Sequence, residues 1–386
     1  MKVTLINSFY SRSTPSGENE NFKQLISGLR KLGVQISAIT IETDEEVKSF
    51  LFRIRSALNT IFGKGSNNPT RKIADLNPDI VHVNNLFPNF ESYWLRNTSF
   101  PKVITVHNYR AICAAGTLSR DGKFCDLCVH KPTSSMRYSC YKDSRLATFP
   151  LYISRLFRIQ ERNLERFQRV YVPSKRALTI FTAAGIANDK WEVVPHAVDI
   201  PEVNFGKKTE KYVFVGRLTS EKGIERILDM WSNDFDIDVI GEGDLDKKRY
   251  ASSEKIKFYG SIPREDVIKM LPSYRALVFC SSSPESALPL VVLESLASGL
   301  PIITTDHNTV ADAVRDGNFG VVLPFDFSAL DLSLALNAIG SNYTSFTTNA
   351  KEYSKKFHNF ENWIGKYISS YKQVVSEWQS EKIHEK

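Results

Sequence analysis

The sequence predicts an α/β protein with two doubly wound, Rossmann-like domains that face a central cleft. The chain has 386 residues, more than one hydrophobic core usually organises. Apolar strand-like runs alternate with helical patterns, as in parallel sheets with crossover helices. The alternation stops near residues 200–210 and then restarts. We therefore expect domains over 1–200 and 210–360, and a C-terminal helix over 361–386 that packs back on the first domain.

Each predicted domain contains strand-like runs that end in polar residues. In the first domain these runs lie at 3–7, 34–41, 79–85, 102–108 and 169–174. In the second domain they lie at 211–216, 235–241, 255–260, 275–280 and 301–305. Ligands of open α/β sheets gather at the carboxyl ends of the strands, so we expect the functional residues in the loops that follow these runs.

The segment 279–305 combines a long apolar run with two carboxylates, Glu285 and Glu294. A membrane span is one interpretation, but a charge at the centre of a bilayer costs ~3 kcal/mol. We instead expect a strand, a loop, a buried helix over 290–298 and a second strand. A carboxylate on such a helix needs a partner, which is either a structural cation or a ligand.

The charge of the chain is uneven along its length. Residues 1–200 carry a net charge of +11, and the remainder carries −4. Basic surfaces attract phosphates of any kind, including nucleic acid, anionic lipid and lipid pyrophosphates, and charge alone does not choose among them. We find neither an export signal nor an apolar run of ~18 residues, so we expect a cytoplasmic protein without a membrane span.

The segment 215–223 has the features of a diphosphate site. A strand ends at Val215, two cations follow at Arg217 and Lys222, and a helix begins after Gly223. The amino terminus of a helix offers free N–H groups, and the cations add charge-assisted donors. A solvated surface loop is the alternative interpretation.

Several motifs in this order resemble the retaining glycosyltransferases of family 4. They are GRLTSEKG at 216–223, GEGDL at 241–245, the pair Glu285 and Glu294, PDIVHVNNLFP at 78–88 and VITVHNYRAIC at 103–113. The resemblance spans nearly the whole chain. It implies the GT-B fold, in which two Rossmann-like domains hold a nucleotide sugar between them.

The resemblance also implies roles for individual residues. Arg217 and Lys222 would bind the donor diphosphate and stabilise the leaving group as its charge develops. Glu285 would contact the transferred sugar, and His107 would lie near the reacting centre. The remaining residues that would bind the nucleotide sugar are Gly17, Ser286, Leu288, Leu290 and Glu294, with Glu294 on the ribose hydroxyls.

One departure from the family concerns the first glutamate. The family usually has one residue fewer between its two glutamates than this chain has between Glu285 and Glu294. Either a bulge absorbs the extra residue and Glu285 keeps its role, or Ser286 takes the aligned position. We favour Glu285.

The implied reaction is transfer of a hexose-type sugar, with retention and without a catalytic metal. The donor would be a nucleotide-diphosphate sugar, and the acceptor a glycan, lipid-linked, in surface polysaccharide synthesis (O-antigen, capsule or exopolysaccharide). The alternatives are another GT-B enzyme, such as a nucleotide-sugar epimerase, or a non-enzymatic protein that binds polyanions or phospholipids. We do not expect nucleic acid as a partner, and we expect no cofactor other than a structural zinc.

Four of the five cysteines lie close together in the sequence, at Cys113, Cys125, Cys128 and Cys140. A cytoplasmic chain rarely keeps disulfides, and four thiolates can hold a tetrahedral zinc. Only one C-x2-C pair is present, which argues against this site. A structural zinc is therefore one of two open interpretations.

The stretch 142–176 contains nine Lys and Arg residues interleaved with apolar ones. This pattern suggests a basic amphipathic helix that lies on an anionic membrane, which would make the enzyme peripheral on the inner face of the membrane. A helix packed on the core with a solvated basic face is the alternative.

Overall fold

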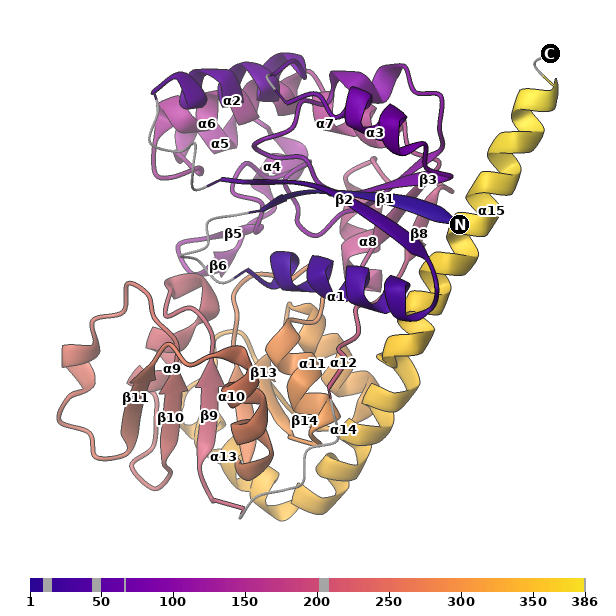
Figure 1. The fold of residues 1–386 in the computed structure, drawn as a ribbon. Coiled ribbons are helices and arrows are strands. Elements are labelled where there is room, and N and C mark those ends of the chain that lie inside the picture. Colours follow the sequence, from indigo (N-terminus) through magenta and orange to yellow (C-terminus); the bar gives the residue numbers. More distant parts are fainter. Residues whose placement is uncertain (10–15, 44–49, 66, 201–207, 385–386) are drawn as a thin grey trace. The chain divides into compact units, whose positions relative to one another are not determined.

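The structure is a computed structural model that describes residues 1–9, 16–43, 50–65, 67–200 and 208–384. It divides into two compact units (Figure 1). Unit 1 comprises Met1–Thr117, Asp126–His196 and Phe360–Lys386, and unit 2 comprises Leu118–Cys125 and Ala197–Asn359. Most of the expected boundary at 200–210 lies outside the described residues.

Unit 1 is a six-stranded parallel sheet covered by helices on both faces. The strands lie in the order β2-β1-β3-β4-β7-β8. Helix α1 covers one face, and α2 and α6 cover the other (Figure 1). The elements are β1 (Lys2–Phe9), α1 (Gly17–Lys31), β2 (Gln35–Glu42), α2 (Phe50–Phe62), α3 (Thr70–Leu76), β3 (Ile80–Asn85), β4 (Lys102–Thr105), α4 (Leu127–His130), α5 (Ser134–Arg137), α6 (Arg145–Leu156), α7 (Ile159–Leu164), β7 (Arg169–Val172), α8 (Lys175–Ala183), β8 (Trp191–Val193) and α15 (Phe360–His384).

Unit 2 has a second six-stranded parallel sheet, in the order β11-β10-β9-β12-β13-β14. Counted within the unit this is 3-2-1-4-5-6, the strand order of the dinucleotide-binding Rossmann fold. The elements are the hairpin β5 (Ser119–Arg120) and β6 (Lys123–Phe124), then β9 (Tyr212–Val215), α9 (Ile224–Asp229), β10 (Ile237–Ile240), β11 (Ile256–Gly260), α10 (Arg264–Met270), β12 (Ala276–Phe279), α11 (Leu290–Ala297), β13 (Ile302–Thr305), α12 (Thr309–Gly317), β14 (Gly320–Leu323), α13 (Ala329–Ser341) and α14 (Tyr343–Phe357).

The C-terminal helix α15 belongs to unit 1. Its buried stripe includes Tyr367 and Tyr371, which are almost fully enclosed. The Tyr371 hydroxyl lies 2.5 Å from Nδ1 of His82, on the central strand β3. Gly28 lets α1 approach closely, because a Cβ atom there would lie 2.5 Å from the Ile364 side chain. Packing of one apolar stripe therefore joins the end of the chain to its beginning.

The predicted α/β class and all ten predicted strands are confirmed. The sequence analysis missed the short strands β8 and β14 and the hairpin β5–β6. The single basic helix suggested for 142–176 is wrong: α6 ends before Arg158, which has a left-handed backbone (φ 51°), and α7 and strand β7 follow. Among the described residues, no helix is both long and apolar enough to cross a membrane.

Candidate active site

The candidate site of unit 2 lies where the chain reverses its direction of winding. Strands β9 and β12 are neighbours, but the chain goes from β9 toward β10 and from β12 toward β13. The loops after β9 and β12 therefore diverge and leave a crevice at the carboxyl edge of the sheet, where ligands of this fold bind. The predicted residues Arg217 and Lys222 follow β9, and Glu285 follows β12.

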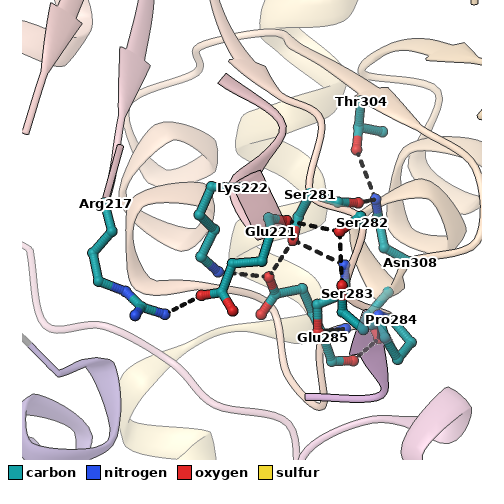
Figure 2. Close-up of polar contacts among 12 residues, drawn as sticks. Arg217, Glu221, Lys222, Ser281, Ser282, Ser283, Pro284, Glu285, Thr304 and Asn308 are labelled. Atoms are coloured by element: carbon teal, nitrogen blue, oxygen red, sulfur yellow. Dashed lines mark hydrogen bonds and ion pairs between the residues drawn. The ribbon is translucent and has the colours of Figure 1, made fainter. Parts of the chain in front are cut away.

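Lys222 and Glu285 form an ion pair across this switch point (Figure 2). Nζ of Lys222 donates to Oε1 of Glu285 at 2.7 Å, and the Ser281 hydroxyl donates to the same oxygen at 2.7 Å. Both charged side chains are mostly buried, with 19% and 16% of their surface exposed. A partly buried pair of this kind is weakly screened by solvent, so the lysine is held in one position at the mouth of the crevice.

The backbone conformation at Glu285 sets the course of the loop that follows β12. Glu285 has a left-handed conformation (φ 47°), which costs a residue with a side chain ~1–3 kcal/mol. Thr309, at the start of α12, stabilises it: its hydroxyl donates to the carbonyl oxygens of Pro284 at 3.1 Å and Glu285 at 2.7 Å. The loop thus directs the Glu285 carboxylate toward Lys222. Whether Glu285 or Ser286 contacts a sugar stays a prediction.

The two loops are also joined through Glu221. Arg217 donates to the Glu221 carboxylate, and the guanidinium remains about half exposed (Figure 2). The carbonyl oxygen of Glu221 accepts from the Ser282 backbone N–H at 2.9 Å and from the Ser281 hydroxyl at 3.2 Å. The sequence analysis missed these three residues, although the serine run at 281–283 was a visible signal.

Gly223 joins the loop after β9 to α9. Its φ is 70°, and a Cβ atom there would lie 2.2 Å from the carbonyl oxygen of Cys280. Only glycine allows the two loops to approach this closely. The predicted glycine at the start of the helix is therefore required by backbone contact between the loops.

Glu294 has a protein partner in this structure. It lies on α11, is almost fully buried, and accepts from Nε of Arg264 at 2.7 Å. Arg264 is the first residue of α10, and its side chain is one-third exposed. Of the other predicted residues, Leu288 is buried in the core and Leu290 begins α11, which has no side-chain cap. Glu294 is thus already ion-paired with Arg264 of the protein itself.

The hairpin β5–β6 adds a segment that the sequence analysis did not place at this site. Its Ser119 hydroxyl lies 2.9 Å from the Ser282 hydroxyl. Asp121 and Gly122, in the hairpin turn, line a cavity of about 270 Å³ together with Gly223 and Ser282. The hairpin, which belongs to the Cys-rich region, therefore forms one wall of the cavity beside Gly223.

His107 and Gly17 lie in unit 1. His107 is enclosed, and its Nε2 lies 3.2 Å from Oδ1 of Asn84, at the end of β3. Burial, and then the charge of His82, lowers the pKa of His107 to about 3, so the imidazole is neutral at pH 7. Gly17 is the first residue of α1, which Ser16 caps. His107 also lines a cavity of about 120 Å³, together with Asn84 and Asn108.

Glu18, next to Gly17, is a titratable residue that the sequence analysis missed. Burial raises the pKa of Glu18 to about 7, although the positive charge of Arg110 and the hydrogen bond from Asn108 act in the opposite direction. Nδ2 of Asn108 lies 3.5 Å from Oε2 of Glu18, and Oε1 is enclosed. No sequence pattern distinguished this glutamate from an ordinary first-turn acidic residue.

The four cysteines are free thiols that divide between the two units. Cys113 and Cys128 are buried, Cys125 and Cys140 are half-buried, and none forms a disulfide. Among the residues that the structure describes, no group of three or more His, Cys, Asp or Glu side chains is placed to hold a metal ion. Cys125 ends the hairpin segment of unit 2, whereas the other three belong to unit 1. A structural zinc on these four cysteines stays a prediction.

Two family models match the chain. Residues 22–202 match the model described as Glycosyltransferase Family 4, and residues 197–357 match the one described as Glycosyl transferases group 1. Together the two models span most of the chain.

Curated relatives match over shorter stretches. They include the "41.2 kDa protein in cps region" of Klebsiella pneumoniae, at 22% identity over 50% of this chain and 57% of the relative. The D-rhamnosyltransferase WbpZ of Pseudomonas aeruginosa is 28% identical over 29% of this chain and 32% of its own. The amylovoran biosynthesis glycosyltransferase AmsD of Erwinia amylovora is 29% identical over 30% of this chain and 35% of its own. The matches thus span from about a third to just over half of these relatives.

Solved structures match over nearly the full length. Sucrose-phosphate synthase from Thermosynechococcus elongatus has a TM-score of 0.70 at 15% identity, covering 97% of this chain and 99% of that one. Anabaena HepE in complex with UDP and glucose has a TM-score of 0.61 at 14% identity, covering 96% and 100%. These likenesses confirm the predicted GT-B fold.

Proposed function

We propose that this chain is a GT-B glycosyltransferase that transfers a sugar from a nucleotide-diphosphate donor to a glycan acceptor. The observation that carries the proposal is the Lys222–Glu285 pair, with Nζ and Oε1 2.7 Å apart at the switch point of a Rossmann sheet. A fixed, partly desolvated cation beside a half-exposed Arg217 provides the charge that a departing diphosphate needs.

In the proposed mechanism the protein positions the reactants and stabilises charge. Lys222 and Arg217 hold the leaving diphosphate, and Glu285 releases part of its hold on Lys222 to accept from hydroxyls of the sugar. The departing phosphate takes the proton of the acceptor hydroxyl on the same face, so the anomeric configuration is retained. The neutral imidazole of His107 serves as a hydrogen-bonding partner near the sugar, since burial holds its pKa at about 3. No step is routed through a metal.

We further propose that the sugar is a hexose type and that the acceptor is a lipid-linked glycan of surface polysaccharide synthesis. The names of the relatives WbpZ and AmsD support this assignment, and the UDP and glucose in the HepE complex support a nucleotide-sugar donor. A structural zinc on the Cys-rich region stays a separate proposal, which elemental analysis of the purified protein tests.

A thermal-shift screen with UDP, GDP and ADP sugars tests the proposal. We expect one nucleotide series to raise the melting temperature, because a ligand at ~100 times its Kd stabilises by about 2.7 kcal/mol. The Lys222→Met variant should lose that shift. If no nucleotide sugar stabilises the protein, or if the variant keeps the full shift, the proposal is wrong. Conversion of the bound donor to an epimer without an acceptor would instead support an epimerase.

A further inference from the structure

Three basic residues lie at the amino edge of the unit 1 sheet, opposite the edge that carries His107. Lys102 begins β4, Arg166 precedes β7 by three residues, and Lys190 directly precedes β8. Strands β4, β7 and β8 are parallel neighbours in the sheet, so their starting residues lie at the same edge. At a rise of ~3.3 Å per residue, the start of β4 is ~10 Å from its end at Thr105. The three cations are therefore separate from the polar residues around His107.

Hydrogen bonds hold the three strand starts side by side. The backbone N–H of Lys102 donates to Oε1 of Gln168 at 2.9 Å, and the N–H of Gln168 donates to the Lys102 carbonyl oxygen at 3.0 Å. On the other side of β7, the N–H of Val170 donates to the Lys190 carbonyl oxygen at 2.9 Å. We call Lys102, Arg166 and Lys190 the amino-edge cluster.

Lys102 is the recessed member of the amino-edge cluster. Only 5% of its surface is exposed, and its Nζ donates to the Thr98 hydroxyl at 2.7 Å. A hydroxyl satisfies one of the three ammonium donors and supplies no negative charge, so burial of this cation is costly. Burial, and then the charges of Arg166 and Lys190, lower the pKa of Lys102 to about 8. The cluster thus brings like charges together around a buried ammonium group.

The cluster has no carboxylate partner within the part of the chain that the structure describes. Nε of Arg166 is enclosed without a hydrogen-bond partner, and Nζ of Lys190 donates to a backbone carbonyl oxygen, that of Glu165, at 3.4 Å. The carboxylates nearest along the chain belong to Glu165 and Asp189, and both residues are exposed. A buried cation without a counter-charge is unfavourable, so the site is suited to an anion from outside the chain.

Other cations at strand starts show that this is not a general property of the protein. Four of them each form an ion pair with a carboxylate of the same unit. The pairs are Arg169 with Glu377 at 2.9 Å, Lys211 with Asp238 at 3.5 Å, Lys255 with Asp236 at 3.4 Å, and Arg275 with Glu210 at 3.2 Å. The amino-edge cluster departs from this pattern, and Lys211 provides a matched control.

We propose that the amino-edge cluster binds a small soluble anion of the phosphate class, either inorganic phosphate or the phosphoryl group of a small molecule. A tetrahedral dianion brings two negative charges, and its oxygens accept from ammonium and guanidinium groups together. Lys102 is too deeply set to meet the flat surface of a bilayer, which favours a free anion over a lipid headgroup. The inference is independent of the proposed function, because the cluster lies at the other edge of the sheet.

Hydrogen exchange of the full chain tests the inference, with inorganic phosphate titrated against sodium chloride at equal ionic strength. We expect phosphate to slow exchange of the amides over 98–103 and 166–171 in a saturable way, since a ligand stabilises the state that binds it. Lys102→Met and Arg166→Gln should each raise the half-saturating phosphate concentration at least tenfold, because each removes a hydrogen bond between charged groups.

Two control variants should keep the half-saturating concentration of the native chain. Lys211→Met removes a strand-start lysine that has its own carboxylate. Lys222→Met removes the proposed diphosphate cation of unit 2, so failure of this inference is distinguishable from failure of the proposed function. Lys102→Met replaces a buried cation by an apolar side chain, and without phosphate it should melt no lower than the native chain.

Three results would overturn the inference. They are equal protection by chloride, a full phosphate response in Lys102→Met/Arg166→Gln, and an equal loss of response in Lys211→Met. Flotation with phosphatidylglycerol vesicles distinguishes the source of the phosphate group. Binding to these vesicles through Lys102 and Arg166, without any response to free phosphate, would overturn the inference in favour of a lipid headgroup.

Discussion

The two units have similar sheets but different chemistry at their switch points. In unit 2 the loops after β9 and β12 meet through charged groups, with Lys222 paired to Glu285 and Arg217 to Glu221. In unit 1 the switch point lies between β1 and β3, and the contacts that Ser8 makes there with two asparagines join neutral groups. Nδ2 of Asn85 lies 3.4 Å from the Ser8 carbonyl oxygen, and Asn89 donates to the Ser8 hydroxyl at 2.8 Å.

Charged and neutral side chains at the carboxyl edge of a sheet are suited to different ligands. A diphosphate requires cations, and cations that stay fixed without a ligand need carboxylates beside them. Sugar hydroxyls are matched by groups that both donate and accept, such as the amides of Asn84 and Asn108 and the neutral imidazole of His107. Under the proposed function, unit 2 would bind the anionic donor and unit 1 the uncharged acceptor. Four experiments test this difference between the two units.

The largest effect is expected for Lys222→Met. Loss of a charge-stabilising donor should lower kcat/KM by a factor of ~100 or more. It should also destabilise unit 2 by ~3 kcal/mol, because Glu285 would be left mostly buried without its cation. In the double variant Lys222→Met/Glu285→Gln we expect the stability to return and the activity to stay low. An active double variant would show that the ion pair is only structural.

Unit 1 should lose stability in acid. Burial lowers the pKa of both His82 and His107 from the ordinary 6.5 to about 3. The unfolded chain therefore takes up two protons as the pH falls below 6.5, whereas the folded chain does not. The stabilisation is full above pH 6.5 and is lost at ~1.4 kcal/mol per pH unit for each histidine.

Glu18 acts in the opposite direction. Its pKa is raised by burial from 4.5 to about 7, so its contribution is full below pH 4.5 and is lost as the pH rises toward 7. Between pH 6.5 and 4.5 we expect a net loss of ~1.4 kcal/mol per pH unit on acidification, and ~2.8 kcal/mol per pH unit in Glu18→Gln. Hydrogen exchange of the β1 and β3 amides measures this. Identical slopes in the two proteins would contradict the assignment.

A moderate effect is expected for Glu294→Gln. If Glu294 binds the ribose, the variant should weaken donor binding about tenfold, since a hydrogen bond to a charged group contributes ~1.5–3 kcal/mol. The matched variant Arg264→Met removes the partner that donates at 2.7 Å and keeps the carboxylate. It should retain most of the donor affinity in calorimetric titration. Equal loss of stability in both variants, with unchanged affinity, would leave Glu294 with a structural role only.

The smallest effect is expected for Ser119→Ala. This change removes the hydrogen bond between the hairpin and Ser282 and should cost ~1 kcal/mol of hairpin docking. A double-mutant cycle with Ser282→Ala, followed by proteolysis of the hairpin, isolates the coupling between the two hydroxyls. Additive effects would show that the hairpin is held by other contacts.

Regular patterns in the sequence predicted most of the fold. Strand β9, for example, follows from an apolar run that ends at a glycine, and α15 from apolar residues at helical spacing. The break at Arg158 was not predicted, because a single residue with φ 51° leaves the helical pattern of its neighbours unchanged. Strand β14 was missed although it is as long as β9; it is less buried than β9 and begins with a glycine.

The site was predicted less completely. Arg217, Lys222 and Glu285 were identified from spacing and from family resemblance, but their partners were not. Arg264 lies 30 residues before Glu294, so nothing local in the sequence connects them. Glu18 was missed because its raised pKa results from burial, which depends on segments distant in the sequence.

The sequence alone was enough to predict the order of strands and helices. It was also enough to place cations after β9 and carboxylates after β12. These features are local, since they depend on periodicity and on which residues follow a strand. Which charges neutralise each other and which histidines stay neutral became visible only in the tertiary structure. Those properties depend on groups far apart in the chain, because pairing and burial arise when separate strands and helices pack together.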